Sequence, residues 1–287
     1  MRNENFQISI VIPVYNEGDS LSACLKAIDK LKTKPYEVIV VDNNSTDHSV
    51  SVASTYPWVR LIKEKKQGVV HARTSGFNAV KGNIIARIDA DTILPSDWID
   101  KLNAIFKDNP DVVAVSGSGD YYDFVLQKIA NRIDHWARNY LERRLGDRLF
   151  LQGCNMAVTK AAWDKVKGGL CPCDGLHEDL DLGIHLQEAG MKVIYDETLV
   201  AGISSRRISN DFSKFVQYSL ASPRTYKAHD IGRRRYMFAV IAIVLALYAP
   251  GHLAYESYDP ELGEFSLKYL ASSKFRKSRT DPTINLV

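Results

Sequence analysis

Runs of apolar residues recur along the first hundred residues and predict buried strands. Residues 8–12, 38–41 and 84–88 are apolar along almost their whole length, as expected of strands that are covered on both faces. Between the first two runs, apolar side chains repeat at helical spacing over residues 21–28. Continuous apolar strands that alternate with helices predict an α/β fold, with a mostly parallel sheet and helices on both of its faces.

Polar residues follow these strands directly. Residues 13–17, 42–44 and 89–91 each come just after a predicted strand. Right-handed crossovers place every strand-to-helix turn at the same edge of a parallel sheet, and ligands of open α/β sheets bind at that edge. The three polar segments are therefore expected to converge on one crevice.

The second half of the chain is less regular. Its patterns predict strands at 112–115, 149–158 and 192–195, and helices at 124–144, 159–166 and 177–190. Thr159 is expected to cap the second of these helices. We expect one domain over residues 1–225, followed by a basic and hydrophobic C-terminal part at 226–287.

The segment Asp89-Ala90-Asp91 carries the strongest chemical signal. Two carboxylates this close repel each other unless a cation lies between them, and Mg²⁺-like ions bind through one or two carboxylates plus substrate phosphates. We therefore expect Mg²⁺ or Mn²⁺ carrying a diphosphate. Asp91 is assigned to the metal, Asp89 to the ribose or a metal-bound water, and Ala90 to the same nucleotide site. Two solvated turn aspartates are the alternative interpretation.

The first two polar segments suggest a nucleobase pocket. Asp42 can accept a hydrogen bond from the imide N–H of a uracil-like base, and Tyr15 can pack on its ring. In the simpler interpretation, Ser45 or Asp47 only caps the following helix, and we expect one of them to do so. The expected nucleotide site in these segments comprises Pro13, Tyr15, Glu17, Asp42 and Asn44.

Glu178 and Asp179 open a predicted helix and are candidates for catalytic proton transfer. A carboxylate at that place, kept ionised by the helix dipole, can take a proton from a hydroxyl. Alternatively, both residues only complement the dipole, an effect of about 0.3–1 kcal/mol each. His177 could orient an acceptor, but a lone His is more often structural or solvent-facing, and we expect Asp181 to be an exposed neighbour.

Charge is divided unevenly along the chain. The net charge is +3, but residues 206–287 hold 13 Lys and Arg against 7 Asp and Glu (+6), and the remainder holds 24 against 27 (−3). A basic C-terminal part suits anionic lipid or nucleic acid. A composition that is 45% apolar and 25% charged is ordinary for a globular enzyme of this length.

The four cysteines do not form a recognisable framework. Cys24 lies on the apolar face of the first predicted helix. Cys171-Pro172-Cys173 offers half of a metal site, but no second Cys/His pair stands at zinc-finger spacing, so a structural zinc is not expected. Few cysteines, and an N-terminus without a signal-peptide cleavage site, predict a catalytic part that faces the cytosol.

An uninterrupted apolar run covers residues 237–249 and follows three arginines. It is shorter than the ~20 residues of a spanning helix, and extending it to residue 255 includes Pro250. A buried helix in a cytoplasmic protein is one interpretation. We favour a membrane-embedded or interfacial helix at the cytoplasmic face, because the run lacks a polar stripe. The basic tail from residue 256 would then lie on anionic lipid.

Five short motifs in this order resemble those of glycosyltransferase family 2, which has the GT-A fold. The resemblance covers roughly residues 8–210 and implies an inverting, metal-dependent hexosyltransferase. It implies a nucleotide-sugar donor, Asp179 as the base, and a metal that offsets charge on the departing diphosphate. The motifs are residues 9–17, 41–47, 68–76, 89–91 and 177–182.

The resemblance also suggests partners and further contacts. Arg73 is expected at the edge of the donor site, in contact with the diphosphate or the base, and Arg206 and Arg207 are weaker candidates. The acceptor is expected to be a glycan or a lipid-linked molecule of the cell envelope, with no nucleic-acid partner. The Gln-x-x-Arg-Trp signature of processive synthases is missing, which favours transfer of a single sugar.

Two departures and two alternatives accompany this interpretation. Asn43 and Asn44 stand where Asp and Gly are commoner, and residues 201–205 lack a His that helps to hold the metal in many relatives. A sugar nucleotidyltransferase shares the layout but normally opens with a Gly-rich phosphate loop, unlike residues 13–17. The other alternative is a non-catalytic, membrane-tethered protein that binds nucleotide sugars.

Overall fold

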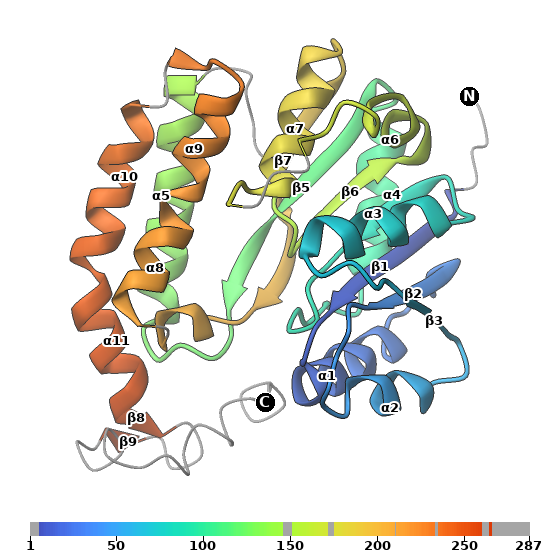
Figure 1. Cartoon of the computed structure of the whole chain (residues 1–287), viewed down its shortest axis with the longest axis horizontal. Coiled ribbons are helices and arrows are strands. Elements are labelled where there is room, and N and C mark those ends of the chain that lie inside the picture. The colour runs from blue at the N-terminus through green and yellow to red at the C-terminus, as the bar shows by residue number, and fades with distance from the viewer. Residues whose placement is uncertain are drawn as a thin grey trace.

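The structure, a computed structural model, describes residues 6–145, 151–171, 175–209, 211–232, 235–259 and 264–265. Its main sheet has seven strands in the order β3-β2-β1-β4-β6-β5-β7 (Figure 1). They are β1 (Ile8–Val14), β2 (Glu37–Asp42), β3 (Val59–Lys63), β4 (Ile84–Arg87), β5 (Val112–Tyr121), β6 (Met156–Thr159) and β7 (Lys192–Ile203). Only β6 runs antiparallel to its neighbours, so the mostly parallel sheet predicted from the apolar runs is confirmed.

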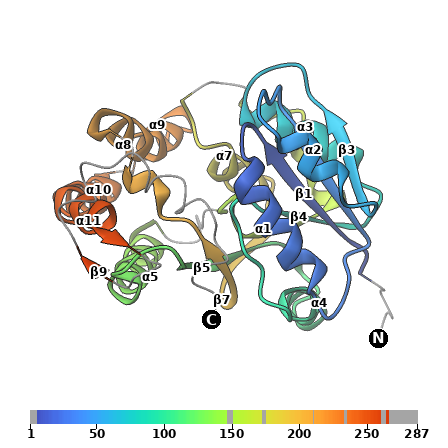
Figure 2. The ribbon, with the colours of Figure 1, turned by 90° about the horizontal axis from the view of Figure 1, so that it is seen from below.

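The helices fall into two groups. The first covers the sheet and comprises α1 (Gly18–Asp29), α2 (Ser49–Ser54), α3 (Val69–Ala79), α4 (Trp98–Asp108), α6 (Lys160–Val166) and α7 (Glu178–Glu188). The second stands beside the sheet and comprises α5 (Gln127–Leu145), α8 (Phe212–Ser219), α9 (Ala221–Ala228), α10 (Arg235–Ala246) and α11 (Tyr248–Ser257) (Figures 1 and 2). A short 3-10 helix, η1 (Arg206–Ser209), joins β7 to α8, and the short strands β8 (Tyr258–Asp259) and β9 (Glu264–Phe265) pair after α11.

Successive side chains of the central strands bury themselves on opposite faces of the sheet. In β1, Ile10 and Ile12 belong to the core cluster that includes α1 and α4, and Val11 belongs to the cluster that includes α3, α6 and α7. This alternation follows from the period of two in a strand. Because both faces are covered, the central strands are apolar along most of their length, and ligands can approach at the edges of the sheet.

The expected helices of the second half are present. Residues 124–144 correspond to α5, 159–166 to α6 and 177–190 to α7, each within about one turn at its ends. Thr159 caps α6 as predicted, since its hydroxyl oxygen accepts the backbone N–H of Ala162 at 3.3 Å.

The strand expected at 149–158 is shorter than predicted, because β6 begins only after Asn155. The Asn155 side chain is fully buried and donates to the carbonyl oxygens of Ser118 (2.8 Å) and Leu199 (2.7 Å). It also accepts the indole N–H of Trp98 at 3.0 Å. These bonds fix a turn ahead of the strand; residues 149 and 150 lie outside the described residues.

A small third core joins the helices beside the sheet to α7. Its buried members include Leu141 of α5, Leu180 and Ile184 of α7, and Tyr226 of α9. Helix α9 runs through the expected domain boundary between residues 225 and 226. The C-terminal helices are therefore packed against the element that carries Glu178 and Asp179.

The apolar C-terminal run forms α10 and α11, which follow each other almost without a break (Figure 1). Pro250 stands in the first turn of α11, where a missing N–H leaves no helical bond unmade. Within the described residues, Arg235–Ser257 is the one helical stretch long and apolar enough to cross a bilayer, and only 17% of its most apolar window is buried. The charged tail beyond residue 265 lies outside the described residues.

Candidate active site

The loops that follow β1 and β2 are tied together at the carboxyl edge of the sheet. Asp42, at the end of β2, lies opposite Val14 and accepts the backbone N–H of Ser45 at 3.1 Å. Asn16 adopts the left-handed conformation (φ 54°), and its side-chain oxygen accepts the backbone N–H of Thr46 at 2.8 Å. The two segments expected to wall a nucleobase pocket therefore form one rigid unit.

The residues of this unit that are expected to bind the nucleotide differ in their exposure and hydrogen bonds. Tyr15 is 51% exposed, so its ring is free of the core, whereas Asp42 is buried beneath the loops. Asn44, also left-handed (φ 65°), donates to the carbonyl oxygen of Lys65 at 2.9 Å, which gives its amide a role in loop structure. Pro13 is half-buried at the end of β1.

Asp47 caps two helices, as the simpler interpretation of its motif predicted. One carboxylate oxygen accepts the backbone N–H of Ser49 at 2.9 Å, at the start of α2, and the other accepts the N–H of Gly18 at 3.0 Å, at the start of α1. A carboxylate satisfies the free N–H groups at a helix N-terminus. Asp47 thus holds α1 and α2 in place below the site.

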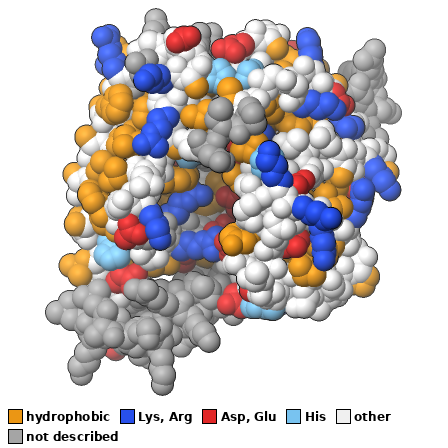
Figure 3. All heavy atoms as spheres, viewed as in Figure 1, with side chains coloured by type: hydrophobic (Ala, Val, Ile, Leu, Met, Phe, Trp, Pro, Cys, Tyr) orange, Lys and Arg blue, Asp and Glu red, His pale blue; other side chains and the backbone are white. Residues whose placement is uncertain are grey.

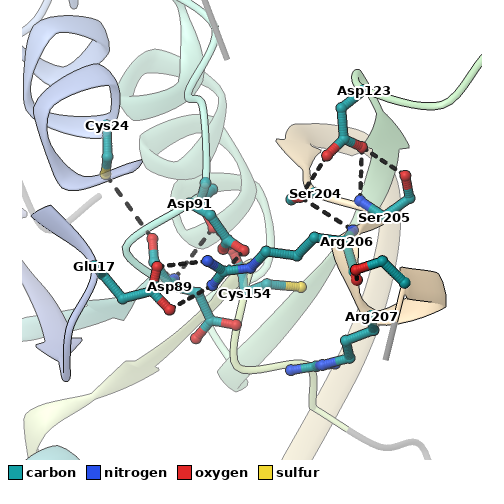
Figure 4. Close-up of polar contacts among 12 residues, drawn as sticks. Glu17, Cys24, Asp89, Asp91, Asp123, Cys154, Ser204, Ser205, Arg206 and Arg207 are labelled. Carbon is teal, nitrogen blue, oxygen red and sulfur yellow. Dashed lines mark hydrogen bonds and ion pairs between the residues drawn. The ribbon is translucent and has the colours of Figure 1, made fainter. Parts of the chain in front are cut away.

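Arg206 bridges two acidic residues from separate loops (Figure 4). Its guanidinium pairs with both oxygens of Glu17, one of them at 2.6 Å, and with an oxygen of Asp91 at 2.9 Å. Burial raises the pKa of Asp91 to about 6; Arg206 opposes that rise, and Asp89 and Glu17 add to it. The third polar segment thus meets the first across one cation, as the sheet topology predicted.

Arg87 forms a second, deeper bridge. This buried residue pairs with Asp89 at 2.9 Å and with Glu178 at 2.9 Å. Burial lowers the pKa of Arg87, but the carboxylates of Glu178 and Asp89 outweigh that effect and raise it above its usual range. Glu178 is itself only 7% exposed, so the pair is structural in character. Of the two expected acidic residues on α7, Asp179 is the better placed for chemistry.

Two backbone N–H groups orient Asp179. One carboxylate oxygen accepts from Gly153 at 2.7 Å and the other from Leu180 at 2.8 Å. Gly153 also lies against the deeper bridge. Any other residue at this position would place its Cβ atom 1.2 Å from Nη1 of Arg87. The absence of a side chain at position 153 therefore lets Asp179 and the Arg87 bridge lie side by side.

The expectation for Arg73 is wrong. Its side chain is 1% exposed, donates to the carbonyl oxygen of Glu178 at 2.9 Å, and lies over the ring of Trp163 with 5.4 Å between guanidinium carbon and ring centroid. It therefore supports α7 from inside the protein and has no access to a donor. Polar and apolar residues are mixed along α3, and this pattern gave no signal that Arg73 faces inward.

The expectation for Asp181 is also wrong, because this residue is 1% exposed. It lies one turn into α7, on the face that packs toward His229 after α9, and accepts a hydrogen bond from that imidazole at 2.8 Å. The backbone N–H of His177 donates to Thr225 at 3.0 Å, and its ring contacts Tyr218.

The sequence only weakly indicates the roles of the two bridging arginines. Arg206 ranked as a weak candidate and Arg87 had no assigned role. A charged residue inside an otherwise apolar strand, directly before two aspartates, was the available signal for Arg87, since a buried cation needs an anionic partner. Tyr122 gave no such signal, although its hydroxyl donates to the carbonyl oxygen of Asp91 at 2.9 Å.

Comparison with known sequences agrees with this geometry. Residues 9–165 match the profile described as Glycosyl transferase family 2, more than half of the chain. The chain belongs to this family. The resemblance drawn from the five motifs is thereby confirmed.

Two relatives give the level of similarity. The chain is 36% identical over 146 residues (48% of this chain, 41% of the relative) to the undecaprenyl-phosphate 4-deoxy-4-formamido-L-arabinose transferase of Serratia proteamaculans. It is 33% identical over 157 residues (52% and 47%) to the protein of the same name from Yersinia enterocolitica. The matched part thus spans less than half the length of each of these relatives.

Solved structures show the same fold. A mannosyltransferase from Pyrobaculum calidifontis, in complex with GDP-Man and Mn²⁺, aligns with a TM-score of 0.59 at 19% identity, over 99% of this chain and 86% of that one. Glucosyl-3-phosphoglycerate synthase of Mycobacterium tuberculosis aligns with a TM-score of 0.58 at 17% identity, over 78% and 80%. The expected GT-A fold with a C-terminal apolar helix is confirmed.

Breaking the Arg87 bridge should destabilise the protein strongly. We expect Arg87→Met to lower the free energy of unfolding by about 3–5 kcal/mol, because it leaves the buried Glu178 without a cation. Arg60→Met is the matched control: its side chain is 43% exposed and pairs with Glu37 at 3.6 Å, so the loss should stay under about 1 kcal/mol. Urea titrations that give equal losses would contradict the assignment.

Proposed function

We propose that this chain is a metal-dependent, inverting glycosyltransferase that moves one sugar from a nucleotide-diphosphate donor to a lipid-linked acceptor. The observation that carries the proposal is the meeting of acidic residues from remote segments around two arginines at one edge of the sheet. Membership of Glycosyl transferase family 2 supports the same class of reaction.

The first two polar segments are proposed to bind the nucleoside. Tyr15 would pack on the base and Asp42 would accept its imide N–H, with Glu17 and Asn44 at the border of the pocket. The exposure of Tyr15 and the rigid link between the two loops support this role.

Asp91 and Asp89 would hold Mg²⁺ or Mn²⁺. Their hard carboxylate oxygens suit such ions, and the protein already places a cationic side chain against Asp91, which shows that positive charge is favoured there. A bound metal would supply Lewis-acid stabilisation of the charge that develops on the diphosphate. Arg206 adds a guanidinium in the same place, where it can form paired hydrogen bonds with phosphate oxygens. It stands in the region where residues 201–205 lack a His.

Asp179 is the proposed base. Each of its oxygens accepts one backbone N–H and keeps a further lone pair for an acceptor hydroxyl. As the hydroxyl oxygen attacks the anomeric carbon, Asp179 takes its proton, and the bond from that carbon to the diphosphate breaks with its electron pair. Attack from the side opposite the leaving group inverts the configuration at that carbon.

The lipid-linked acceptor is supported by the relatives and by the C-terminal helices. The relatives' names specify undecaprenyl phosphate. Hydrophobic side chains gather over the edge formed by α10 and α5 (Figure 3), and Phe238, Leu247 and Leu253 are 49%, 41% and 50% exposed. We propose that α10 and α11 place the enzyme at the cytoplasmic face of a membrane.

A basic groove on α5 offers a site for a lipid phosphate beside this apolar edge. The groove has a volume of about 660 Å³. Guanidinium groups suit phosphate oxygens, and aromatic side chains suit the boundary between water and lipid. Its lining includes Arg132, His135, Trp136, Tyr140 and Arg143.

Replacing the proposed base should separate catalysis from donor binding. We expect Asp179→Asn to bind the donor nearly as tightly as the wild type. Its turnover should fall by about 10²–10⁴-fold, because no carboxylate is left to take the proton of the attacking hydroxyl. Release of nucleoside diphosphate in the presence of acceptor measures turnover. Asp164→Asn, an exposed carboxylate on α6, is the control and should keep full activity.

Near-normal turnover of Asp179→Asn would remove the base assignment. If that result appears only with a lipid monophosphate as acceptor, the nucleophile is a phosphate oxygen, which is largely ionised at neutral pH and needs no base. No metal-dependent release of nucleoside diphosphate from any donor would instead favour the non-catalytic binding protein.

Charging the exposed apolar side chains should release the protein from membranes. Each large side chain buried in lipid contributes about 1.5–3 kcal/mol, so we expect Phe238→Glu with Leu253→Glu to weaken binding to liposomes at least about tenfold. Tyr36→Glu, at a 52% exposed position on the catalytic part, should bind like the wild type. Co-flotation with vesicles measures this, and a wild type that does not float would contradict membrane association.

A further inference from the structure

Four side chains with metal-ligating atoms meet in a place apart from the acidic crevice. They are Cys171, Asp181, His185 and His229, and one ligand atom from each lies within 4.8 Å of the others. Asp181 and His185 are one turn apart on α7, Cys171 precedes that helix, and His229 follows α9. Three segments remote in sequence are thus brought together, which explains why no zinc-finger spacing is visible.

The orientation of the two imidazoles resembles that in metal sites. Nε2 of His229 lies 2.8 Å, and Nε2 of His185 3.6 Å, from the same oxygen of Asp181. Nδ1 of the two rings faces Glu188, at 3.8 Å for His229 and 4.0 Å for His185. A histidine that binds a metal commonly has a carboxylate near its other ring nitrogen, which fixes the tautomer. Glu188 stands in that place for both rings.

One atom of the group lacks a partner. Nε2 of His185 is buried and makes no hydrogen bond within the part of the chain that the structure describes. A buried polar atom left unsatisfied costs about 1–3 kcal/mol and calls for a ligand. The hydrogen bond between Asp181 and His229 accounts for those two residues alone. It does not account for the imidazole of His185.

We propose that Cys171, Asp181, His185 and His229 bind a structural Zn²⁺. One sulfur, two imidazole nitrogens and one carboxylate oxygen form a closed tetrahedral set of the kind zinc prefers, whereas Mg²⁺ and Mn²⁺ disfavour thiolate. The thiolate and carboxylate together balance the ion's charge. Usual zinc–ligand distances require about 3.3–3.8 Å between ligand atoms, so the group needs to contract by only about 1 Å from its widest spacing.

The ion would fasten α7 to α9. These helices otherwise share the small core of Leu180, Ile184 and Tyr226, and α7 carries Asp179 in its first turn. With four protein ligands the site has no open position for a substrate, so its role is stability. The backbone N–H of Cys171 donates to the second oxygen of Asp181 at 3.1 Å, which orients the carboxylate.

Metal content tests the proposal directly. The acidic crevice is disabled as a metal site with Asp91→Asn, and this full-length variant is purified without chelator and then measured by plasma mass spectrometry. We expect about one zinc per chain. Adding His185→Gln and His229→Gln should lower bound zinc at least about tenfold. His48→Gln with His71→Gln, on the catalytic part, is the matched control and should leave the zinc in place.

Substitution with Co²⁺ identifies the sulfur ligand by its absorption spectrum. Co²⁺ in the zinc-depleted Asp91→Asn protein should give a thiolate charge-transfer band in the near ultraviolet. The band should vanish in Cys171→Ser and persist in Cys154→Ser, whose thiol lies near Asp89 (Figure 4). Added Zn²⁺ should also raise the Tm of the depleted protein. A protein that carries no zinc and shows no cobalt–thiolate band, or a band that survives Cys171→Ser, would overturn the proposal.

Discussion

Carboxylates that fold into one partly buried place must be balanced by cations, and this requirement organises the molecule. Arg87 joins Asp89 to Glu178 below the surface, and Arg206 joins Glu17 to Asp91 above it. The arginine of the deeper bridge is buried with its partners. The upper bridge lies where we propose that a metal and a diphosphate bind, so that a ligand would replace its ion pairs.

The fold creates this arrangement through the carboxyl ends of its parallel strands. The ends of β1, β2 and β4 supply the polar loops, and β7, parallel to them, supplies η1 with Arg206. Helix α7 brings Asp179 from the other side and is held by the small core shared with α5 and α9. The apolar helix α10 packs on that same core through Met237, which couples the proposed membrane contact to the element that carries the proposed base.

The periodicity of the sequence was sufficient to predict the sheet, the covering helices and the convergence of three loops, because strand burial and crossover handedness constrain them strongly. It was insufficient to predict which way side chains on helices point. Arg73 and Asp181 both face inward, where polar groups from distant segments form hydrogen bonds with them. The bridge of Arg87 to Glu178 could not be predicted either, because an ion pair between remote segments leaves no local sequence pattern. The cluster of Cys171 and His229 is hidden for the same reason.

We propose that the acidic crevice binds a diphosphate through a cation held at Asp91. Calorimetric titration of nucleoside diphosphates, with and without Mn²⁺, tests it most directly in the wild type, Asp91→Asn and the exposed control Asp111→Asn. The account predicts that Mn²⁺ tightens binding about 10–100-fold in the wild type and the control, and has no effect in Asp91→Asn. An equal gain from Mn²⁺ in all three proteins would contradict it.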